Sequence, residues 1–386
     1  MSIFNITRLL AERGAKIFFV AVSGNEKAEL PEELSRLCES VLIVRTPYKY
    51  GFKSAVRNLF SSVPINVQKY HSGKILKKVI AFAADKKIEL IHVDHLHMAY
   101  YGLALKRILE VPVVLREHNL EFKITERFAE TSSNPALRLY ASLQARKILE
   151  YEPSICAKMD KCIMITEQDR DRLLSLRAGI DADVIPAGVD ADFFKEGSSV
   201  GETDTIGYVG SLDWLPNIDG LKWFVQEVMP IIAKSKPSVK FNIYGKNASH
   251  GIDRLDNGKN VRVKGFVEDV RTVFRESSVM IVPLFAASGI RIKILEAMAA
   301  GKAIVTTSIG CEGINCEPGK HVFIADTPGD FAENVVKILD DSALRAQIGR
   351  AAAEFVREKY SWHQIGDLFW NTYSNLIRDF NKQTGN

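Results

Sequence analysis

The chain has 386 residues, of which 46% are hydrophobic and 25% are charged, and its formal net charge is +4. This composition is typical of globular proteins and excludes a disordered or fibrous chain. At roughly 100–200 residues per domain, the length predicts two domains or three. No apolar run approaches the roughly 18–20 residues that a membrane-spanning helix requires.

The N-terminal residues predict an amphipathic helix over 2–13, which Gly14 ends because glycine readily adopts the left-handed conformation found after helices. Rossmann-like domains usually open instead with a strand and a glycine-rich turn. We therefore expect a first domain that lacks its usual first strand, so that the chain is truncated or its true start lies upstream. No pattern of a secretory signal follows Met1.

Residues 48–87 form a basic segment, with nine Lys or Arg against one acidic residue, Asp85, and with Tyr and Phe interleaved. Such a segment attracts phosphates or an anionic membrane surface. An equally weighted alternative is a solvated helix face, because Lys74, Lys77 and Lys78 have helical spacing. Nucleic acid is disfavoured, since nothing else in the chain resembles a recognition helix or an RNA-binding signature.

Short apolar runs alternate with helical patterns along most of the chain, which predicts βαβ units and parallel sheets. One sheet of eleven strands would be unusually wide, so two sheets in two domains are expected. The polar segment 195–204 and the turn at 186–190 predict the join, and the chain after Pro328 is predicted to be helical. The predicted strands are 17–22, 41–44, 90–93, 113–115, 162–165, 206–209, 240–244, 261–264, 279–283, 303–306 and 321–324.

The segment 279–306 has the strongest indication of chemistry. A buried strand leads into a small-residue loop, and a helix follows that ends at Gly301. In open α/β sheets, ligands bind beyond the carboxyl ends of strands, and the first turn of a helix attracts anions. Arg291 and Lys293 are expected in that first turn, where they oppose the helix dipole unless an anion is bound. A surface helix with random charges is the alternative.

Glu296 is predicted to lie near the edge of the buried face of the same helix, with its side chain directed toward the helix N-terminus. A carboxylate placed in this way can accept two hydrogen bonds from a vicinal diol while a diphosphate lies on the turn above. That arrangement fits a sugar nucleotide.

Five segments in this order resemble the retaining glycosyltransferases of the GT-B type, which include many bacterial polysaccharide and lipopolysaccharide sugar transferases. The resemblance covers nearly the whole chain, and five weak motifs in the right order and spacing are together specific. The segments are PAGVDADFF at 186–194, GYVGSLDWLPNIDGLKWF at 207–224, NIYGK at 242–246, GFVEDVRTVF at 265–274 and SGIRIKILEAMAAGKAIV at 288–305.

The resemblance implies an α/β fold of two Rossmann-like domains that face a cleft. It implies an acceptor-side domain over residues 1–190, a donor domain over 191–360 and a C-terminal helix over 361–386 that crosses back to the first domain. Arg291, Lys293 and His118 are the implied catalytic residues, with a packed or capping histidine as the alternative for His118. The positions implied to bind the donor are Gly210, Ser211, Gly245, Phe266, Val267, Ser288, Gly289, Ile290 and Glu296.

Two departures from the family pattern concern charge. Ser288 stands where the usual motif has a second glutamate, and Ser211 and the region of Asn217 stand where an Arg and Lys pair is common. A subgroup with Arg and Lys in the helix motif is similar to this chain. Arg291 and Lys293 are therefore expected to replace the missing cations against the diphosphate.

The implied activity is transfer of a sugar from a nucleoside-diphosphate sugar to an acceptor hydroxyl with retention, in bacterial surface polysaccharide or lipopolysaccharide biosynthesis. The acceptor is expected to be a glycan or a lipid-linked molecule, and Asp94, His95 and His97 are candidate acceptor residues, although local packing explains them equally well. The alternatives are a non-catalytic nucleotide-binding scaffold of the same fold and a sugar-nucleotide epimerase.

No cofactor and no metal are expected, because a helix dipole and cationic side chains can stabilise the leaving diphosphate. Residues 181–183 fit an Asp-x-Asp metal motif literally, but they precede a strand and are interpreted as a turn. The five cysteines (38, 156, 162, 311 and 316) show no paired or metal-type spacing, which predicts reduced thiols in a cytosolic protein. The predicted location is the cytoplasm, with peripheral binding at the inner face of the plasma membrane.

Overall fold

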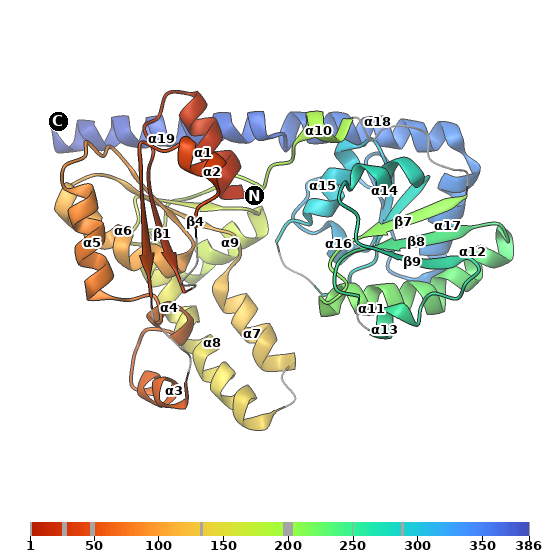
Figure 1. Ribbon diagram of the computed structural model, residues 1–386, viewed down its shortest axis with the longest axis horizontal. Coiled ribbons are helices and arrows are strands. Elements are labelled where there is room, and N and C mark those ends of the chain that lie inside the picture. Colours follow the sequence, from red (N-terminus) through yellow and green to blue (C-terminus); the bar gives the residue numbers. More distant parts are fainter. Residues whose placement is uncertain are drawn as a thin grey trace. The chain divides into compact units, whose positions relative to one another are not determined.

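The computed structural model describes residues 2–24, 29–46, 51–131, 134–195, 204–248, 250–286 and 289–385. The chain divides into two compact units, which are each described by themselves below (Figure 1). Unit 1 comprises Met1–Pro186 and Gly366–Asn386, and unit 2 comprises Ala187–Ile365. The first boundary falls at Pro186, where the sequence placed it at 190, and most of the predicted polar join lies outside the described residues.

Unit 1 contains two parallel sheets rather than the single sheet that the sequence predicted. One sheet is the pair β1–β2 and the other has the order β3-β4-β5-β6. The prediction of one sheet per domain is wrong for this unit, since β1 and β3 are not hydrogen-bonded to each other. The strands are β1 (Phe18–Ser23), β2 (Ser40–Arg45), β3 (Ile91–Asp94), β4 (Val113–Glu117), β5 (Lys161–Met164) and β6 (Ala182–Val184).

Strand β6 was not predicted, because residues 181–183 read as a charged turn. Its position at the sheet edge explains how these charges are tolerated, since one side of an edge strand faces solvent. Lys161 of the neighbouring strand pairs with Asp181 at 2.6 Å and with Asp183 at 3.1 Å. The two aspartates therefore stabilise a strand edge.

The helices of unit 1 follow the predicted alternation. The N-terminal helix α1 covers Ser2–Glu12, and Gly14 has the expected positive φ of 92°. The described part of the basic segment forms α3, α4 and α5, while Tyr48, Lys49 and Tyr50 lie outside the described residues. The remaining bounds are α2 (Glu32–Arg36), α3 (Phe52–Leu59), α4 (Ile65–Gln68), α5 (Gly73–Ala83), η1 (Leu96–Met98), α6 (Ala99–Leu109), α7 (Glu121–Thr131), α8 (Pro135–Cys156) and α9 (Glu167–Leu176).

Unit 2 is a doubly wound domain with one six-stranded parallel sheet of order β12-β11-β10-β7-β8-β9. The chain starts at β7, adds β8 and β9 on one side, and then crosses to β10 on the other. Ligands of such sheets bind at this reversal, beyond the carboxyl ends of the two central strands. The strands are β7 (Thr205–Val209), β8 (Lys240–Tyr244), β9 (Val261–Gly265), β10 (Val279–Val282), β11 (Ala303–Thr306) and β12 (Phe323–Ile324).

Both faces of this sheet are covered by apolar helix surfaces (Figure 1). On one face Phe224 and Phe331 pack against β7, β8 and β11, and on the other face Ile294 and Val356 pack against β10 and β11. Burial on both faces explains why these strands read as continuous apolar runs. The helices are α10 (Ala191–Lys195), α11 (Leu215–Trp223), η2 (Phe224–Val228), α12 (Met229–Ser235), α13 (His250–Asp253), α14 (Arg271–Glu276), α15 (Ile292–Ala299), α16 (Ser308–Cys311), α17 (Pro328–Asp340) and α18 (Ser342–Lys359).

The C-terminal helix α19 (Trp362–Thr384) begins in unit 2 and belongs to unit 1 from Gly366 onward. The Trp362 ring lies against Gly188 of unit 2, where a Cβ atom would be 2.6 Å from the ring. Further along, Phe369 and Tyr373 are buried in unit 1. This path confirms the predicted return of the C-terminal helix to the first domain. None of the helices within the described ranges combines the length and apolarity needed to cross a membrane.

Candidate functional site

The turn after β7 lies at the reversal point of the unit 2 sheet, and it contacts the turn after β8. The Gly210 amide donates a hydrogen bond to the Tyr244 carbonyl at 3.1 Å. A Cβ atom on Gly245 would lie only 1.8 Å from the Gly210 carbonyl oxygen. Glycine is therefore required at this contact, which brings together two of the predicted donor-binding residues.

Lys293 lies in the first turn of α15, as predicted, and its ammonium group reaches the turn after β7. Its Nζ donates to the Asn217 Oδ1 at 3.1 Å and to the Tyr208 hydroxyl at 3.2 Å. A Cβ atom on Gly210 would lie 2.5 Å from this Nζ, so the glycine leaves room for the ammonium group. Burial lowers the pKa of Lys293 to about 8, while the nearby Glu296 carboxylate acts in the opposite direction.

Arg291 does not lie in the first turn of α15, and this part of the prediction is wrong. It occupies the N-cap position, one residue before the helix, because its ψ of 93° is extended rather than helical. Its guanidinium group, which is only 4% exposed, donates to the Gly289 carbonyl and to the Ile309 carbonyl, the latter at 2.6 Å. Glu312 lies 3.5 Å away. Arg291 therefore stabilises the turn before α15 through its hydrogen bonds to these two carbonyl groups.

Glu296 lies in the second turn of α15 and is half-buried. Burial raises the pKa of its carboxyl group, and the charge of Lys293 opposes this rise. Within the described ranges the carboxylate has no hydrogen-bond or ion-pair partner. A half-buried carboxyl group without a partner beside an ammonium group is a candidate ligand-binding group.

The other predicted donor-binding residues that the structure describes follow the carboxyl ends of strands of the unit 2 sheet. Gly289 has the positive φ of 76° that a tight turn before a helix requires, and Ile290 packs on the core. Ser288 lies outside the described residues. Ser211 is exposed, and its Oγ donates to Asp213 at 2.5 Å. Its carbonyl accepts a 2.7 Å hydrogen bond from the Asn217 amide.

The turn after β9 presents an exposed aromatic ring. Phe266 is 55% exposed, and the Lys246 Nζ lies 4.2 Å from its ring centroid. Val267 instead packs against the core of unit 2. Of this predicted pair, Phe266 alone offers a side-chain surface to a ligand.

Two residues near Lys293 were not predicted to bind a ligand. Tyr208 was hidden within an apolar strand, and Asn217 was noted only because a common cation is absent from its region. Asn217 is 2% exposed and connects Lys293 to the Ser211 carbonyl. The sequence feature that could have indicated Asn217 is an amide side chain in the first turn of a helix that follows a glycine turn.

In unit 1, His118 directly follows β4 and forms part of a histidine cluster around Asp94. Its Nε2 lies 2.9 Å from the Asp94 Oδ1, and the His92 Nε2 lies 3.7 Å from the same oxygen. Burial alone would raise the pKa of Asp94, but the hydrogen bond with His118 and the nearby His92 ring hold it well below its ordinary value. The His95 ring stacks on His118 with 4.2 Å between centroids. The candidate acceptor residues Asp94 and His95 are therefore close to His118.

Asp94, His95 and His118 offer ligand-type atoms that all lie within 4.8 Å of one another. The buried Arg116 guanidinium, whose Nη1 is 3.9 Å from Asp94, places a positive charge beside this cluster. That charge opposes a divalent cation, so the cluster is better suited to hydrogen bonding with a polar ligand. The expectation that no metal takes part stays a prediction.

Glu117, the last residue of β4, is a completely buried acid beside Glu152. Burial raises the pKa of Glu117 well above its ordinary value, and the Glu152 carboxyl group acts in the same direction. Burial likewise raises the pKa of Glu152 to about 8. Each native-state pKa exceeds the unfolded value, so the native state holds protons that the unfolded chain releases. These two carboxyl groups therefore contribute a fall in the free energy of unfolding as the pH rises from about 5 to 8.

In the Glu117→Gln variant the free energy of unfolding is expected to depend less on pH. At pH 8 it should be higher than in the wild type by about 1–3 kcal/mol. Gln keeps the shape of the protonated carboxyl group and carries no charge. Urea unfolding at a series of pH values measures the effect. Glu126→Gln, a change of an exposed residue on α7, is the matched control and should leave the pH profile unchanged. A parallel profile for Glu117→Gln would contradict the prediction.

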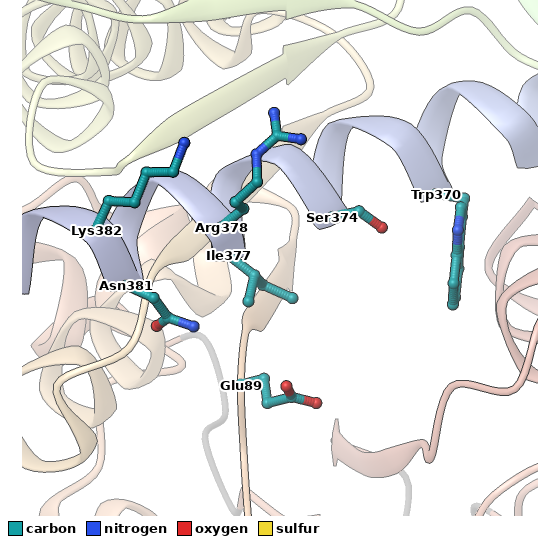
Figure 2. Close-up of a pocket in the computed structure, with 7 residues that line it drawn as sticks. All are labelled: Glu89, Trp370, Ser374, Ile377, Arg378, Asn381 and Lys382. Atoms are coloured by element: carbon teal, nitrogen blue, oxygen red, sulfur yellow. The ribbon is translucent and has the colours of Figure 1, made fainter. Parts of the chain in front are cut away.

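A cavity of about 600 Å³ lies on unit 1, apart from all the residues discussed above (Figure 2). It is lined by Glu89 and by residues of α19, among them Trp370, Ile377 and Arg378. None of the predicted site residues lines this cavity. It therefore adds nothing to the two candidate sites.

Solved structures with the same fold include glycosyltransferases of the GT-B type. A sucrose-phosphate synthase from Thermosynechococcus elongatus matches with a TM-score of 0.71 and 16% identity, over 97% of this chain and 92% of that one. Anabaena Alr3699/HepE, solved in complex with UDP and glucose, matches with a TM-score of 0.63 and 16% identity, over 93% and 99%. These similarities confirm the predicted α/β fold of two Rossmann-like domains.

Residues 1–193 match the family described as Glycosyltransferase Family 4, and residues 203–341 match Glycosyl transferases group 1. The chain belongs to this family of glycosyltransferases, as its motifs predicted.

The curated relatives differ in how much of the chain they match. An uncharacterized 44.6 kDa protein in the cps region of Klebsiella pneumoniae is 27% identical over 167 residues. This match spans 41% of this chain and 43% of that protein, which is less than half of its length. The D-inositol 3-phosphate glycosyltransferase of an Arthrobacter species is 22% identical over 353 residues, which cover 84% of this chain and 81% of that protein.

Proposed function

We propose that this protein transfers a sugar from a nucleoside-diphosphate sugar to an acceptor hydroxyl with retention of configuration. The observation that carries the proposal is the group formed by Gly210, Lys293 and Glu296 at the strand reversal of unit 2. An ammonium group, a glycine turn and a half-buried carboxyl group that has no partner among the described residues converge where doubly wound sheets bind nucleotides.

The diphosphate would lie on the turn at Gly289 and Ile290, at the N-terminus of α15, because the first amides of a helix attract anions. Lys293 would then lie beside it and counter the negative charge that grows on the leaving phosphate. Arg291 acts through the turn, because its guanidinium group already donates to the Gly289 and Ile309 carbonyls. Its role is thus to fix the position of the amides.

The nucleoside would extend from this turn toward β8 and β9. Glu296 would accept hydrogen bonds from the two ribose hydroxyls, and the backbone at Gly245 would face the base. The exposed Phe266 ring offers a flat surface on which a base can stack.

The reaction would pass through a transition state that resembles an oxocarbenium ion, with charge growing on the leaving diphosphate. Preorganised donors aimed at such charge are usually the largest catalytic contribution. The leaving phosphate would take the acceptor proton, and no cofactor is required. The retaining course is supported by a trehalose-6-phosphate synthase whose structure concerns glycosyl transfer with retention. It matches 96% of this chain with a TM-score of 0.63 and 13% identity.

The acceptor would be a glycan or lipid-linked molecule of surface polysaccharide synthesis. The Klebsiella relative lies in a cps region, and a poly(ribitol-phosphate) N-acetylglucosaminyltransferase of Staphylococcus aureus is 24% identical over 156 residues. His118 and His95 in unit 1 are the proposed acceptor-side residues.

A thermal-shift screen with UDP, GDP and ADP tests the proposal. A ligand at 100 times its dissociation constant should stabilise the protein by about 2.7 kcal/mol. The nucleotide that stabilises most then selects the sugar nucleotides for transfer assays. No shift with any of the three would overturn the donor assignment. Binding without transfer or hydrolysis would favour the scaffold alternative.

We further propose that unit 1 docks on an anionic membrane through the basic segment 48–87, and that apolar residues next to it take part. Val56, Leu59 and Phe60 at α3 are exposed, and Phe60 is 91% exposed. Helix α8 lies against α3, since the Lys147 Nζ donates to the Asn58 carbonyl at 2.6 Å.

Exposed residues of α8 extend this surface. Leu139 and Leu143 are apolar, while Arg138 and Arg146 are basic and exposed. Apolar side chains flanked by basic ones suit a bilayer interface, where each cation near anionic lipid contributes about 1 kcal/mol.

The Phe60→Ser variant is expected to weaken binding to vesicles that contain phosphatidylglycerol by about tenfold or more, because insertion of a Phe side chain contributes about 1.5–3 kcal/mol. Vesicle co-sedimentation measures the change. Ile108→Ser replaces another exposed residue of unit 1, on α6, and should leave the binding unchanged. Equal binding by wild type and the Phe60→Ser variant would rule out this docking surface.

A further inference from the structure

Two cysteines for which the sequence predicted no partner lie next to each other, near the turn that is the proposed diphosphate site. Cys311 ends α16, Cys316 follows five residues later, and their sulfur atoms are 2.8 Å apart with both thiols free. The sequence spacing does not indicate this contact, which arises because the chain folds back between the two residues. Gly313 has a positive φ of 81°, and the Ile314 amide donates to the Cys311 carbonyl at 3.1 Å.

The two thiols have different surroundings. Cys311 is buried, whereas Cys316 is half-buried and therefore within reach of a small reagent. The two sulfurs are within hydrogen-bonding distance, and the hydrogen bond with Cys311 lowers the pKa of the Cys316 thiol. Because the thiolate is the nucleophile, Cys316 is the residue that attacks an oxidant, and Cys311 is positioned to complete a disulfide.

The dithiol is connected to the turn that carries the proposed diphosphate site. The Arg291 guanidinium donates to the carbonyl of Ile309, which lies in the same short helix as Cys311. Thr307 is the N-cap of this helix. Its hydroxyl group accepts a hydrogen bond at 3.2 Å from the amide of Leu284, which lies two residues after the end of β10. Any shift of Cys311 therefore reaches both ends of the segment 284–291.

We propose that Cys311 and Cys316 form a reversible dithiol–disulfide site that takes a small hydroperoxide and displaces the Arg291 anchor when it closes. A disulfide requires about 2.05 Å between sulfurs, so the pair must close by about 0.75 Å from its present 2.8 Å. The consequence for nucleotide binding rests on the function proposed above, whereas the formation of the bond does not.

The chemistry is balanced with hydrogen peroxide as the oxidant. The Cys316 thiolate attacks one peroxide oxygen, the O–O bond breaks, and the released hydroxide takes a proton to form water. The Cys311 sulfur then attacks the sulfenic acid of Cys316, forms the S–S bond and releases the second water with its own thiol proton. Two thiols lose two electrons and two protons, and the peroxide is reduced to two waters.

Peptide mapping after treatment of the full chain with hydrogen peroxide tests the site. A linked peptide that contains Cys311 and Cys316 is expected, two hydrogens lighter than the reduced pair and restored by dithiothreitol. Cys316→Ser should abolish the linked peptide. Cys38→Ser, which removes a half-buried thiol of unit 1, should leave it unchanged.

Calorimetry with UDP provides the second measurement. The oxidised protein is expected to bind UDP at least about fivefold more weakly than the reduced protein, the lower end of ordinary coupling between sites. The Cys316→Ser variant should lose this sensitivity to peroxide.

Two outcomes overturn the proposal. Oxidation of Cys38 without a linked Cys311–Cys316 peptide would exclude the dithiol site. A linked peptide with unchanged UDP affinity would overturn the displacement of Arg291. If the reduced protein binds no nucleoside diphosphate, the proposed function fails, and a linked peptide would still support the dithiol site.

Discussion

Lys293→Met is expected to abolish measurable binding of the nucleoside diphosphate and to lower sugar transfer by about 100- to 1,000-fold. The ammonium group lies between Asn217, Tyr208 and Gly210, where it would meet the leaving diphosphate. Met keeps the apolar stem of the side chain, and it removes the charge together with the hydrogen bonds to Asn217 and Tyr208. The packing of the stem is kept, so the fold should survive. Calorimetry with UDP and a transfer assay measure the two effects.

The pH dependence of the same site provides a check on the role of Lys293. Since burial lowers its pKa to about 8, the ammonium group loses its charge as the pH rises through this value. UDP binding by the wild type should therefore weaken above about pH 8. A UDP affinity that does not change as the pH rises through about 8 would contradict this role of Lys293.

Lys302 supplies a matched control for Lys293. It lies three residues after the end of α15, its Nζ donates to the Ser277 carbonyl at 3.3 Å, and burial lowers its pKa to about 8 as well. Lys302→Met also removes a buried ammonium group, but one at the other end of the helix, so UDP affinity should be unchanged. If the Lys293→Met variant binds UDP as tightly as the wild type, the placement of the diphosphate beside Lys293 is wrong.

Glu296→Gln is expected to remove the preference of the protein for ribonucleotides over deoxyribonucleotides. A carboxylate accepts both ribose hydroxyl hydrogen bonds, and each such bond to a charged group contributes about 1.5–3 kcal/mol. The wild type should therefore bind UDP at least about tenfold more tightly than 2′-deoxy-UDP. The variant should bind both ligands with the weaker affinity.

Calorimetric titration of each protein with the two ligands measures this preference. Glu333→Gln, a change of an exposed carboxylate on α17, is the control and should keep the wild-type ratio. A Glu296→Gln variant that still distinguishes the two ligands would show that another group contacts the ribose.

The sequence predicted the strands well where both sheet faces are buried. The predicted strands 240–244 and 303–306 have the observed bounds of β8 and β11, because covered parallel strands are continuous apolar runs between turns. Strand β6 was missed since Asp183 within it and Asp181 before it are exposed at the sheet edge. The division of the unit 1 strands into two sheets was missed because alternation of strands and helices specifies neighbours along the chain, not hydrogen bonding between sheets.

The candidate site was predictable in its residues but not in its contacts. Lys293 and Gly210 were both predicted, yet their contact depends on how α15 meets β7. Arg291 was placed in the helix because its spacing fits, whereas its ψ excludes it from the first turn. Cys311 and Cys316 meet through a turn at Gly313, and sequence spacing does not show such a fold-back.

The separation of β1 from β3 has a consequence for the dynamics of unit 1. All six residues of β1 are only half-buried, whereas every residue of β4 is buried. Amides on the unpaired side of β1 have no neighbouring strand within the described sheet to protect them from deuterium. We expect the β1–β2 pair to exchange and to fray first on mild warming, while β4 and β5 keep their protons until the whole unit melts.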